Sequence, residues 1–232
     1  MKRFYKEVSV AEGEGGFRVL LDGKPVRTPA GYSLALPTRA LAEAIAEEWR
    51  GQGDAIDPVS LPFLKLANTV IDGVAANRAE VITAILRFGE NDLLCYRAHQ
   101  PLELAQLQAE GWDPVLAWAR RRHGVEFILV EGFAHADQPL ATLEAFRAAL
   151  ESHDSFSLAA LHVIASIAGS VVLALALADG ELAAAQIFAL SRIDEDYQAG
   201  KWGRDDEAEI RASNLVRELD KAAAFITAAR AG

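Results

Sequence analysis

The apolar run from Leu158 to Ala178, LAALHVIASIAGSVVLALALA, constrains the fold more than any other part of the sequence. A run of this length can cross a lipid bilayer as a helix, or it can lie inside a helical protein with neighbours on every side. It contains His162, Ser166 and Ser170, much of it is alanine, and no Lys or Arg closely flanks either end, as would be usual for a membrane anchor. The run therefore predicts a central buried helix, with His162 in the core.

The hydrophobic pattern changes from a strand-like to a helix-like period at Thr38. Residues 3–36 contain short β-prone segments separated by Asp-Gly and Gly-rich turns, which predicts an antiparallel β-meander. After Thr38, a typical N-cap residue, apolar residues follow at three- and four-residue steps as far as Gly51. We therefore expect an α+β fold, with a small N-terminal domain of meander and helices at 1–85 and a larger, mainly helical domain at 86–232.

Helical patterns dominate the second half of the chain. One strand is expected in VEFILVEG, at 125–132. Asp113-Pro114 is expected to start a separate helix after Gly111, because proline suits the first turn of a helix. The remaining helices are expected at 139–151, 157–178, 181–199 and 205–230.

Charge and cysteine content narrow the partners and the compartment. The chain carries 33 acidic and 23 basic residues, a net charge of −10, which disfavours nucleic acid and an anionic membrane as ligands. The single cysteine, Cys95, allows no internal disulfide and suits a reducing compartment. The start, MKRFYKEVSV, has neither the apolar core of a secretory signal nor the character of a transit peptide. The expected location is therefore the cytoplasm.

Catalytic and cofactor motifs are not recognisable. The spacing of a phosphate-binding loop fails at Arg18, the five histidines show no HExxH pattern, and no serine stands in GxSxG. Cys95 follows two leucines and is expected to be a buried structural residue. We therefore expect no cofactor and no metal. The alternative is a carboxylate- or metal-dependent hydrolase that uses the acidic stretch 194–209.

The acidic stretch, DEDYQAGKWGRDDEAEIR, begins at Asp194. A calcium loop starting there would need glycine at its sixth position, which is Ala199. The acids at 205–207 are expected in the first turn of the last helix, where they offset the helix dipole. Those at 194–196 are expected near the end of the preceding helix, where negative charge is unfavourable. On that helix Glu195 should point outward, flanked by Gln198, so this half of the stretch predicts a binding surface.

A set of ordered motifs resembles one family. The set comprises RFYKEVSV, LDGKPVRTPAG with LALPT, LAEAIAEEW, DLLCYRA, Gln108 with GWDPVLAW, and EDYQAGKWG. In this order they resemble the assembly chaperones of the F-type ATP synthase that act on its α subunit, the ATP-twelve family. The likeness extends over nearly the whole chain.

The resemblance implies a binding protein and not an enzyme, with a small α+β N-terminal domain followed by an orthogonal helical bundle. Its partner would be the free α subunit of the F-type ATP synthase, shielded from aggregation until the β subunit joins. Neither nucleic acid nor stable membrane insertion is expected, and the chaperone should be a monomer. An acidic residue in the family's motif is tied to function, and it matches Glu195. The other candidate partner-binding residues are Phe188, Asp194, Gln198 and Trp202. The chain departs from its mitochondrial relatives after Gly203, where it reads RDDEAE.

Overall fold

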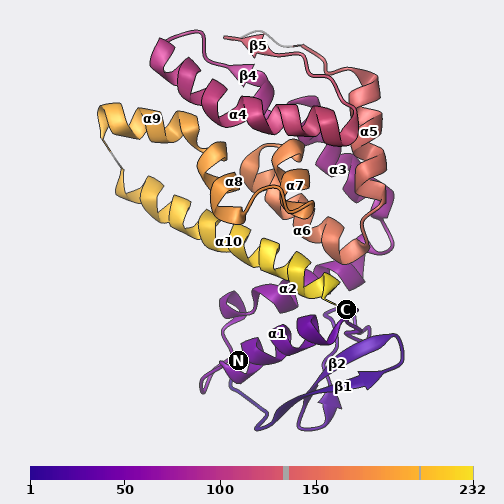
Figure 1. Ribbon diagram of the computed structural model, residues 1–232. Coiled ribbons are helices and arrows are strands. Elements are labelled where there is room, and N and C mark those ends of the chain that lie inside the picture. Colours follow the sequence, from indigo (N-terminus) through magenta and orange to yellow (C-terminus); the bar gives the residue numbers. More distant parts are fainter. Residues whose placement is uncertain (133–135, 204, 232) are drawn as a thin grey trace. The chain divides into compact units, whose positions relative to one another are not determined.

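The computed structural model describes residues 1–132, 136–203 and 205–231 (Figure 1). A small antiparallel sheet near the N-terminus is followed by helices, which confirms the α+β class. The chain forms two compact units, each assembled from separate segments, whereas the predicted division at 85/86 used continuous ones. Unit 1 comprises Met1–Arg78, Asp154–Ala160 and Lys221–Gly232, and unit 2 comprises Ala79–His153 and Leu161–Asp220.

The sheet of unit 1 is the predicted meander. Strands β1 (Val8–Gly13), β2 (Gly16–Leu21) and β3 (Lys24–Pro25) pair antiparallel in that order, with Val8 opposite Leu21. At Gly16 φ is 129°, and a Cβ would lie 2.2 Å from the carbonyl oxygen of Leu36, so only glycine fits this close approach. The turn into β3 is tied down by Asp22. Its carboxylate accepts hydrogen bonds from the backbone amides of Glu7 and Lys6, and these bonds lower its pKa.

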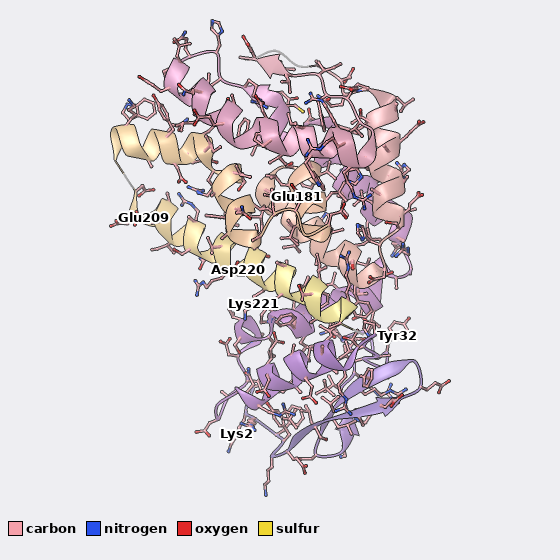
Figure 2. The ribbon with its side chains drawn as sticks, viewed as in Figure 1. Lys2, Tyr32, Glu181, Glu209, Asp220 and Lys221 are labelled. Atoms are coloured by element: carbon pink, nitrogen blue, oxygen red, sulfur yellow. The ribbon has the colours of Figure 1, made fainter. Side chains whose placement is uncertain are left out.

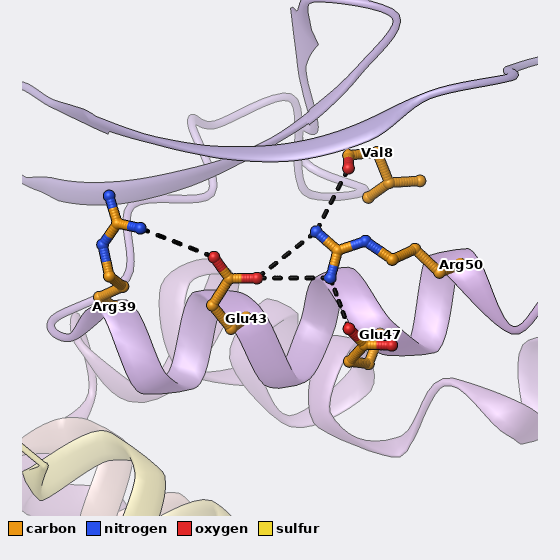
Figure 3. A network of polar contacts seen from close by, with 5 residues as sticks. All are labelled: Val8, Arg39, Glu43, Glu47 and Arg50. Atoms are coloured by element: carbon orange, nitrogen blue, oxygen red, sulfur yellow. Dashed lines mark hydrogen bonds and ion pairs between the residues drawn. The ribbon is translucent and has the colours of Figure 1, made fainter.

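Helix α1 (Arg39–Arg50) begins and ends at the predicted residues. The Thr38 hydroxyl accepts a hydrogen bond from the Leu41 amide at 3.1 Å, and Gly51 is the C-cap. One face of α1 is buried, and the exposed face carries an ion-pair network around Arg50 (Figure 3). The Arg50 guanidinium contacts two glutamates of α1 and also donates to the carbonyl oxygen of Val8 at 3.2 Å. Because these charges are largely exposed, the network adds little stability beyond linking α1 to β1.

A half-buried glutamate of α1 binds the start of the next helix of unit 1. Glu48 lies on α1, and its carboxylate accepts the amides of Phe63 and Leu64 at 2.6 and 3.0 Å, at the start of α2 (Pro62–Thr69). Burial raises the pKa of Glu48, although these two bonds oppose the shift. The short 3-10 helix η1 (Pro58–Ser60) precedes α2, and the π-helix η2 (Val70–Val74) follows it.

Two helices in the C-terminal half of the chain, α6 (Ser155–Ala168) and α10 (Asp206–Arg230), each contribute residues to both units. Helix α6 starts in unit 1, and α10 ends there. Figure 2 labels Asp220, the last residue of α10 that belongs to unit 2, and Lys221, the first that belongs to unit 1. Within unit 1 the Phe225 ring of α10 stacks on Phe63 at 5.8 Å and on Phe156 of α6 at 6.2 Å. These aromatic contacts join residues that are far apart in the sequence, which explains why unit 1 is discontinuous. No local sequence pattern predicts them.

Unit 2 is mainly helical. In chain order its other elements are α3 (Arg78–Glu90), η3 (Leu93–Cys95), β4 (Tyr96–Arg97), α4 (Leu102–His123), β5 (Val130–Glu131), α5 (Leu140–Glu151), α7 (Val171–Ala178), α8 (Ala184–Ser191) and α9 (Ile193–Trp202). Strands β4 and β5 pair in parallel.

The apolar run forms two helices, so the prediction of a single central helix was wrong. Gly169 adopts φ 63° after α6, and the Ser170 hydroxyl accepts the Leu173 amide at 3.0 Å as the N-cap of α7. Residues Val171 to Ala176 are buried, whereas His162 is exposed instead of lying in the core. Across the described ranges, no helix is both long and apolar enough to cross a membrane.

Two further predictions in unit 2 were wrong. Helix α4 continues through Pro114, because the buried side chains on either side of the proline, Trp112 and Val115, hold the helix in place. Of the strand predicted at 125–132 only Val130–Glu131 pairs with a strand. Upstream of it, the amides of Glu126 and Ile128 donate to the side chains of Thr142 and Gln138 instead.

Candidate functional site

The candidate partner-binding residues lie on α8 and α9, which are separate helices. The chain breaks at Arg192, with φ −119° and ψ 14°, so the predicted helix 181–199 was wrong. The three acids Asp194, Glu195 and Asp196 therefore lie in the first turn of α9. There negative charge is favourable, by about 0.3 to 1 kcal/mol per acid. Helix electrostatics thus explain these acids, and the predicted conflict with the helix dipole does not exist.

One face of α9 packs on α4. It is formed by Asp194, Tyr197 and Lys201, which follow at helical spacing. The Gln108 amide donates to the Asp194 carboxylate at 2.6 Å. The Tyr197 hydroxyl donates to Glu103 at 3.0 Å, and the Lys201 ammonium lies 3.9 Å from the same carboxylate. We call these three residues of α9 the inward face.

The break between α8 and α9 is held against the middle of α4. The Trp112 indole, 1% exposed, donates to the carbonyl oxygen of Leu190 at 2.8 Å. A Cβ at Gly111 would lie 2.7 Å from Cδ1 of Ile193 and 3.0 Å from Cδ2 of Leu190. The glycine therefore lets the two segments approach closely. This packing fixes where α9 begins.

A second face of α9 has no partner in the described part of the chain. Glu195, Gln198 and Trp202 are spaced i, i+3 and i+7, so they lie on one side of the helix, about 100° from the inward face. All three are exposed, Trp202 by 81%. Their side chains make no hydrogen bond or ion pair with the described residues. We call this set the outward face.

The other two predicted contact residues are engaged within the protein. Asp194 is only partly exposed and is bound to Gln108. Phe188 is also partly exposed, and the guanidinium of Arg192 lies over its ring at 5.5 Å. Arg192 in turn lies 3.7 Å from the carboxylate of Asp196. Neither Asp194 nor Phe188 belongs to the outward face.

The second half of the acidic stretch begins α10, as predicted. Asp206, Glu207 and Glu209 lie in its first turn. Arg211 lies 3.7 Å from Asp205 and 3.4 Å from Glu207. Residues 194–209 thus serve two helix starts. Among the residues that the structure describes, no group of three or more His, Cys, Asp or Glu could hold a metal ion.

The role of Gln108 in holding the start of α9 was not predicted, although the sequence shows this polar residue within an apolar helical stripe. Gln108 is 1% exposed and lies between the buried residues Leu104 and Trp112, each four residues away on α4. A polar residue in an apolar helical stripe must find a hydrogen-bond partner. Its oxygen accepts the Ala98 amide at 2.7 Å, and its nitrogen reaches Asp194. The motif DLLCYRA, the motif around GWDP and the start of α9 are thereby joined.

Two titratable groups of unit 2 are buried away from α9. Asp92 is fully buried and accepts the amides of Leu94 and Val172, both at 3.1 Å. Burial raises its pKa to about 6, although hydrogen bonds from Ser170 and from these amides oppose the shift. Burial and the neighbouring Asp92 raise the pKa of Cys95 to about 12, so its thiol is unreactive, which agrees with the predicted structural role.

Comparisons with known proteins agree with this architecture. The chain is 28% identical to the mitochondrial protein atp12 of Schizosaccharomyces pombe over 236 aligned positions, covering 96% of this chain and 81% of the relative. It superposes on the crystal structure of Atp12 from Paracoccus denitrificans with a TM-score of 0.95 and 41% identity, covering 99% and 98% of the two chains. A protein from Agrobacterium tumefaciens matches with a TM-score of 0.92 and 48% identity, covering 98% of this chain and 85% of its own.

The sequence profile of one family matches residues 2–120, just over half of the chain. The profile is that of the ATP12 chaperone protein, the family that the sequence motifs resemble. The matched part contains the meander, α1 and most of α4. The solved structures extend the likeness through α9 and α10. The chain belongs to the ATP12 chaperone family.

Proposed function

We propose that this protein is an assembly chaperone of the F-type ATP synthase, which binds the free α subunit and shields it until the β subunit joins. The observation that carries the proposal is the structural match to Paracoccus denitrificans Atp12 over 99% of the chain. A client-binding chaperone of this kind needs an accessible, partly apolar surface and no reaction centre. We expect it to act as a monomer in the cytoplasm.

The outward face of α9 is the surface we assign to the client. An exposed tryptophan is costly to leave in water, and tryptophan is the residue type most enriched among interface residues that carry binding energy. Trp202 is 81% exposed, and Glu195 and Gln198 beside it offer unpaired polar groups. Phe188 and Asp194 would support this surface from its border. The match of Glu195 to the acidic residue of the family's motif adds to the argument.

Release would follow from competition for the client. A chaperone that covers a surface needed for the contact between α and β subunits is displaced when the β subunit binds the same surface more tightly. Glu195 would favour a client surface that carries positive charge and would speed the encounter, whereas Trp202 would supply most of the affinity. The cycle requires no ATP hydrolysis by this protein.

Light scattering with purified α subunit tests the function. The α subunit is warmed alone, with this protein, and with an equal amount of an unrelated acidic protein. Suppression of aggregation by this protein alone, at a ratio near one to one, is the expected result. Equal aggregation in all three samples would refute the chaperone function.

Within the described residues, no structural feature favours the hydrolase alternative. The acids of 194–209 are divided between the first turns of α9 and α10, where they serve the helix dipoles. Calorimetric titration with divalent ions tests this alternative. We expect no stoichiometric binding, whereas binding of one ion per chain would support a metal-dependent hydrolase.

A further inference from the structure

Gln108 connects the interior of unit 2 to the client-binding helix. Its side-chain oxygen accepts the Ala98 amide at 2.7 Å, and its nitrogen donates to Asp194 at 2.6 Å. Ala98 directly follows Arg97, which donates to Asp113 of α4 at 2.8 Å. The amide of Gln108 is therefore held on one side by a braced backbone segment. On its other side it holds the first turn of α9.

The two ends of α9 are attached in different ways. At its start, Asp194 meets a donor that is 1% exposed, so water competes little for this hydrogen bond. Further along the helix, Tyr197 in the middle and Lys201 near the end meet Glu103, whose side chain is 71% exposed. Exposed contacts of this kind contribute little to stability. The direction of α9 therefore depends mainly on the contact between Gln108 and Asp194 and on the packing at Leu190.

We propose that Gln108 is a positioning residue for client binding: it fixes Asp194, and through it the rotation of α9 that presents Glu195, Gln198 and Trp202 together. This inference rests on the proposed function. Asp194 and Glu195 are adjacent on the helix, so rotating one moves the other by the same angle. A small rotation would carry the acidic and the aromatic contact out of register with the client. Gln108 would not touch the client itself.

A donor–acceptor swap isolates this role. In Gln108→Glu the residue still accepts the Ala98 amide but faces Asp194 with a second carboxylate. In Asp194→Asn the new amide oxygen still accepts from Gln108. When the two substitutions are combined, the new carboxylate at position 108 accepts from the new amide nitrogen at position 194, so the contact is restored with reversed polarity. Gln108→Met keeps the length of the side chain and removes both hydrogen bonds.

Neighbouring Gln106 supplies the matched control. It lies on the same helix, is exposed, and donates to Glu110 at 2.8 Å. The substitutions Gln106→Glu and Gln106→Met change the chemistry in the same way at the surface. Neither should alter client binding.

The measurement is the affinity for purified α subunit, well below each variant's melting temperature, together with amide hydrogen exchange of α9. We expect Gln108→Glu and Gln108→Met to bind about 10-fold more weakly with faster exchange in α9, and the double variant to bind within about 3-fold of Asp194→Asn. Binding by either Gln108 variant as tight as the wild type, or a double variant no better than Gln108→Glu, would overturn the proposal. If the wild type does not bind the α subunit, the proposed function fails first, which is a separate outcome.

Discussion

The two faces of α9 use the same kinds of residue for different ends. Each has an acid at its start and an aromatic residue further along: Asp194 and Tyr197 on the inward face, Glu195 and Trp202 on the outward face. The inward residues all have partners on α4. The outward residues have none within the described part of the chain. Residue type therefore does not separate the residues that have internal partners from the residues proposed to bind the client, whereas the position around the helix does.

The largest effect is expected behind the inward face. Trp112→Phe removes the donor to the Leu190 carbonyl and leaves a gap in a buried site, so we expect a loss of about 2 to 4 kcal/mol in the free energy of unfolding. Urea denaturation followed by circular dichroism measures it. A loss below about 0.5 kcal/mol would mean that this packing does not hold the break between α8 and α9.

The outward face should show the reverse behaviour. Trp202→Ala is expected to weaken binding of the α subunit by about 2 kcal/mol or more, because an exposed tryptophan is a typical interface anchor. Its unfolding free energy should change by less than about 0.5 kcal/mol, since the side chain is exposed. Calorimetry and urea denaturation on the same variant give both numbers. Exposed Tyr32 of unit 1 provides the control, and Tyr32→Ala should leave binding unchanged.

Asp92 is a fully buried acid outside α9, so its substitution should affect stability and leave client binding unchanged. Its folded pKa of about 6 lies above its ordinary value of 3.8, so the folded state binds the proton more tightly than the unfolded state. The cost of burying the charge is thus fully present above pH 6 and is relieved as the pH falls towards 4. Asp92→Asn does not titrate.

We therefore expect the difference in unfolding free energy between the wild type and Asp92→Asn to move in favour of the wild type by about 1 kcal/mol from pH 7 to pH 5. Urea denaturation at the two pH values measures this difference. A difference that is the same at both would contradict the assigned shift. Client binding at pH 7 should be the same for both proteins.

Glu195→Lys tests the contributions of Glu195 to stability and to client binding. A positive charge in the first turn of α9 opposes the helix dipole, so we expect a stability loss of about 0.3 to 1 kcal/mol. Binding of the α subunit should fall further than that of Glu195→Gln, because the charge is reversed as well as lost. Affinity measured at two salt concentrations separates these effects. Unchanged affinity for the lysine variant would remove Glu195 from the site.

The smallest effect is expected at Tyr197, in the middle of the inward face. Tyr197→Phe removes the hydroxyl bond to Glu103, a partly exposed contact, and should cost at most about 0.5 to 1 kcal/mol of stability. Thermal unfolding is sensitive enough to detect it. A larger loss would show that the middle of α9 is held as firmly as its start.

Local signals predicted the elements whose ends are set by local chemistry. Thr38 and Gly51 bound α1 because a hydroxyl cap and a glycine act within one turn. The break at Gly169 and Ser170 carried such signals too, but the surrounding apolar pattern hid them. The break at Arg192 has neither glycine nor proline and depends on packing against α4, so the sequence could not reveal it.

The candidate site was predictable only in part for the same reason. Glu195 and Gln198 are only three residues apart on one helix, so they were correctly predicted to lie on the same side although the predicted start of the helix was wrong. The separation of Asp194 from them could not be predicted, because its partner Gln108 lies far away in the sequence. Gln108 was visible as a polar residue in an apolar stripe, but the residue that it bonds is defined only by the tertiary structure.

Amide hydrogen exchange of the wild-type protein, with and without the α subunit, tests the central claim most directly. If the outward face of α9 binds the client, exchange across Ile193–Trp202 should slow on complex formation more than in α1 or α7. Unchanged exchange in α9, with protection appearing in another segment, would contradict the account.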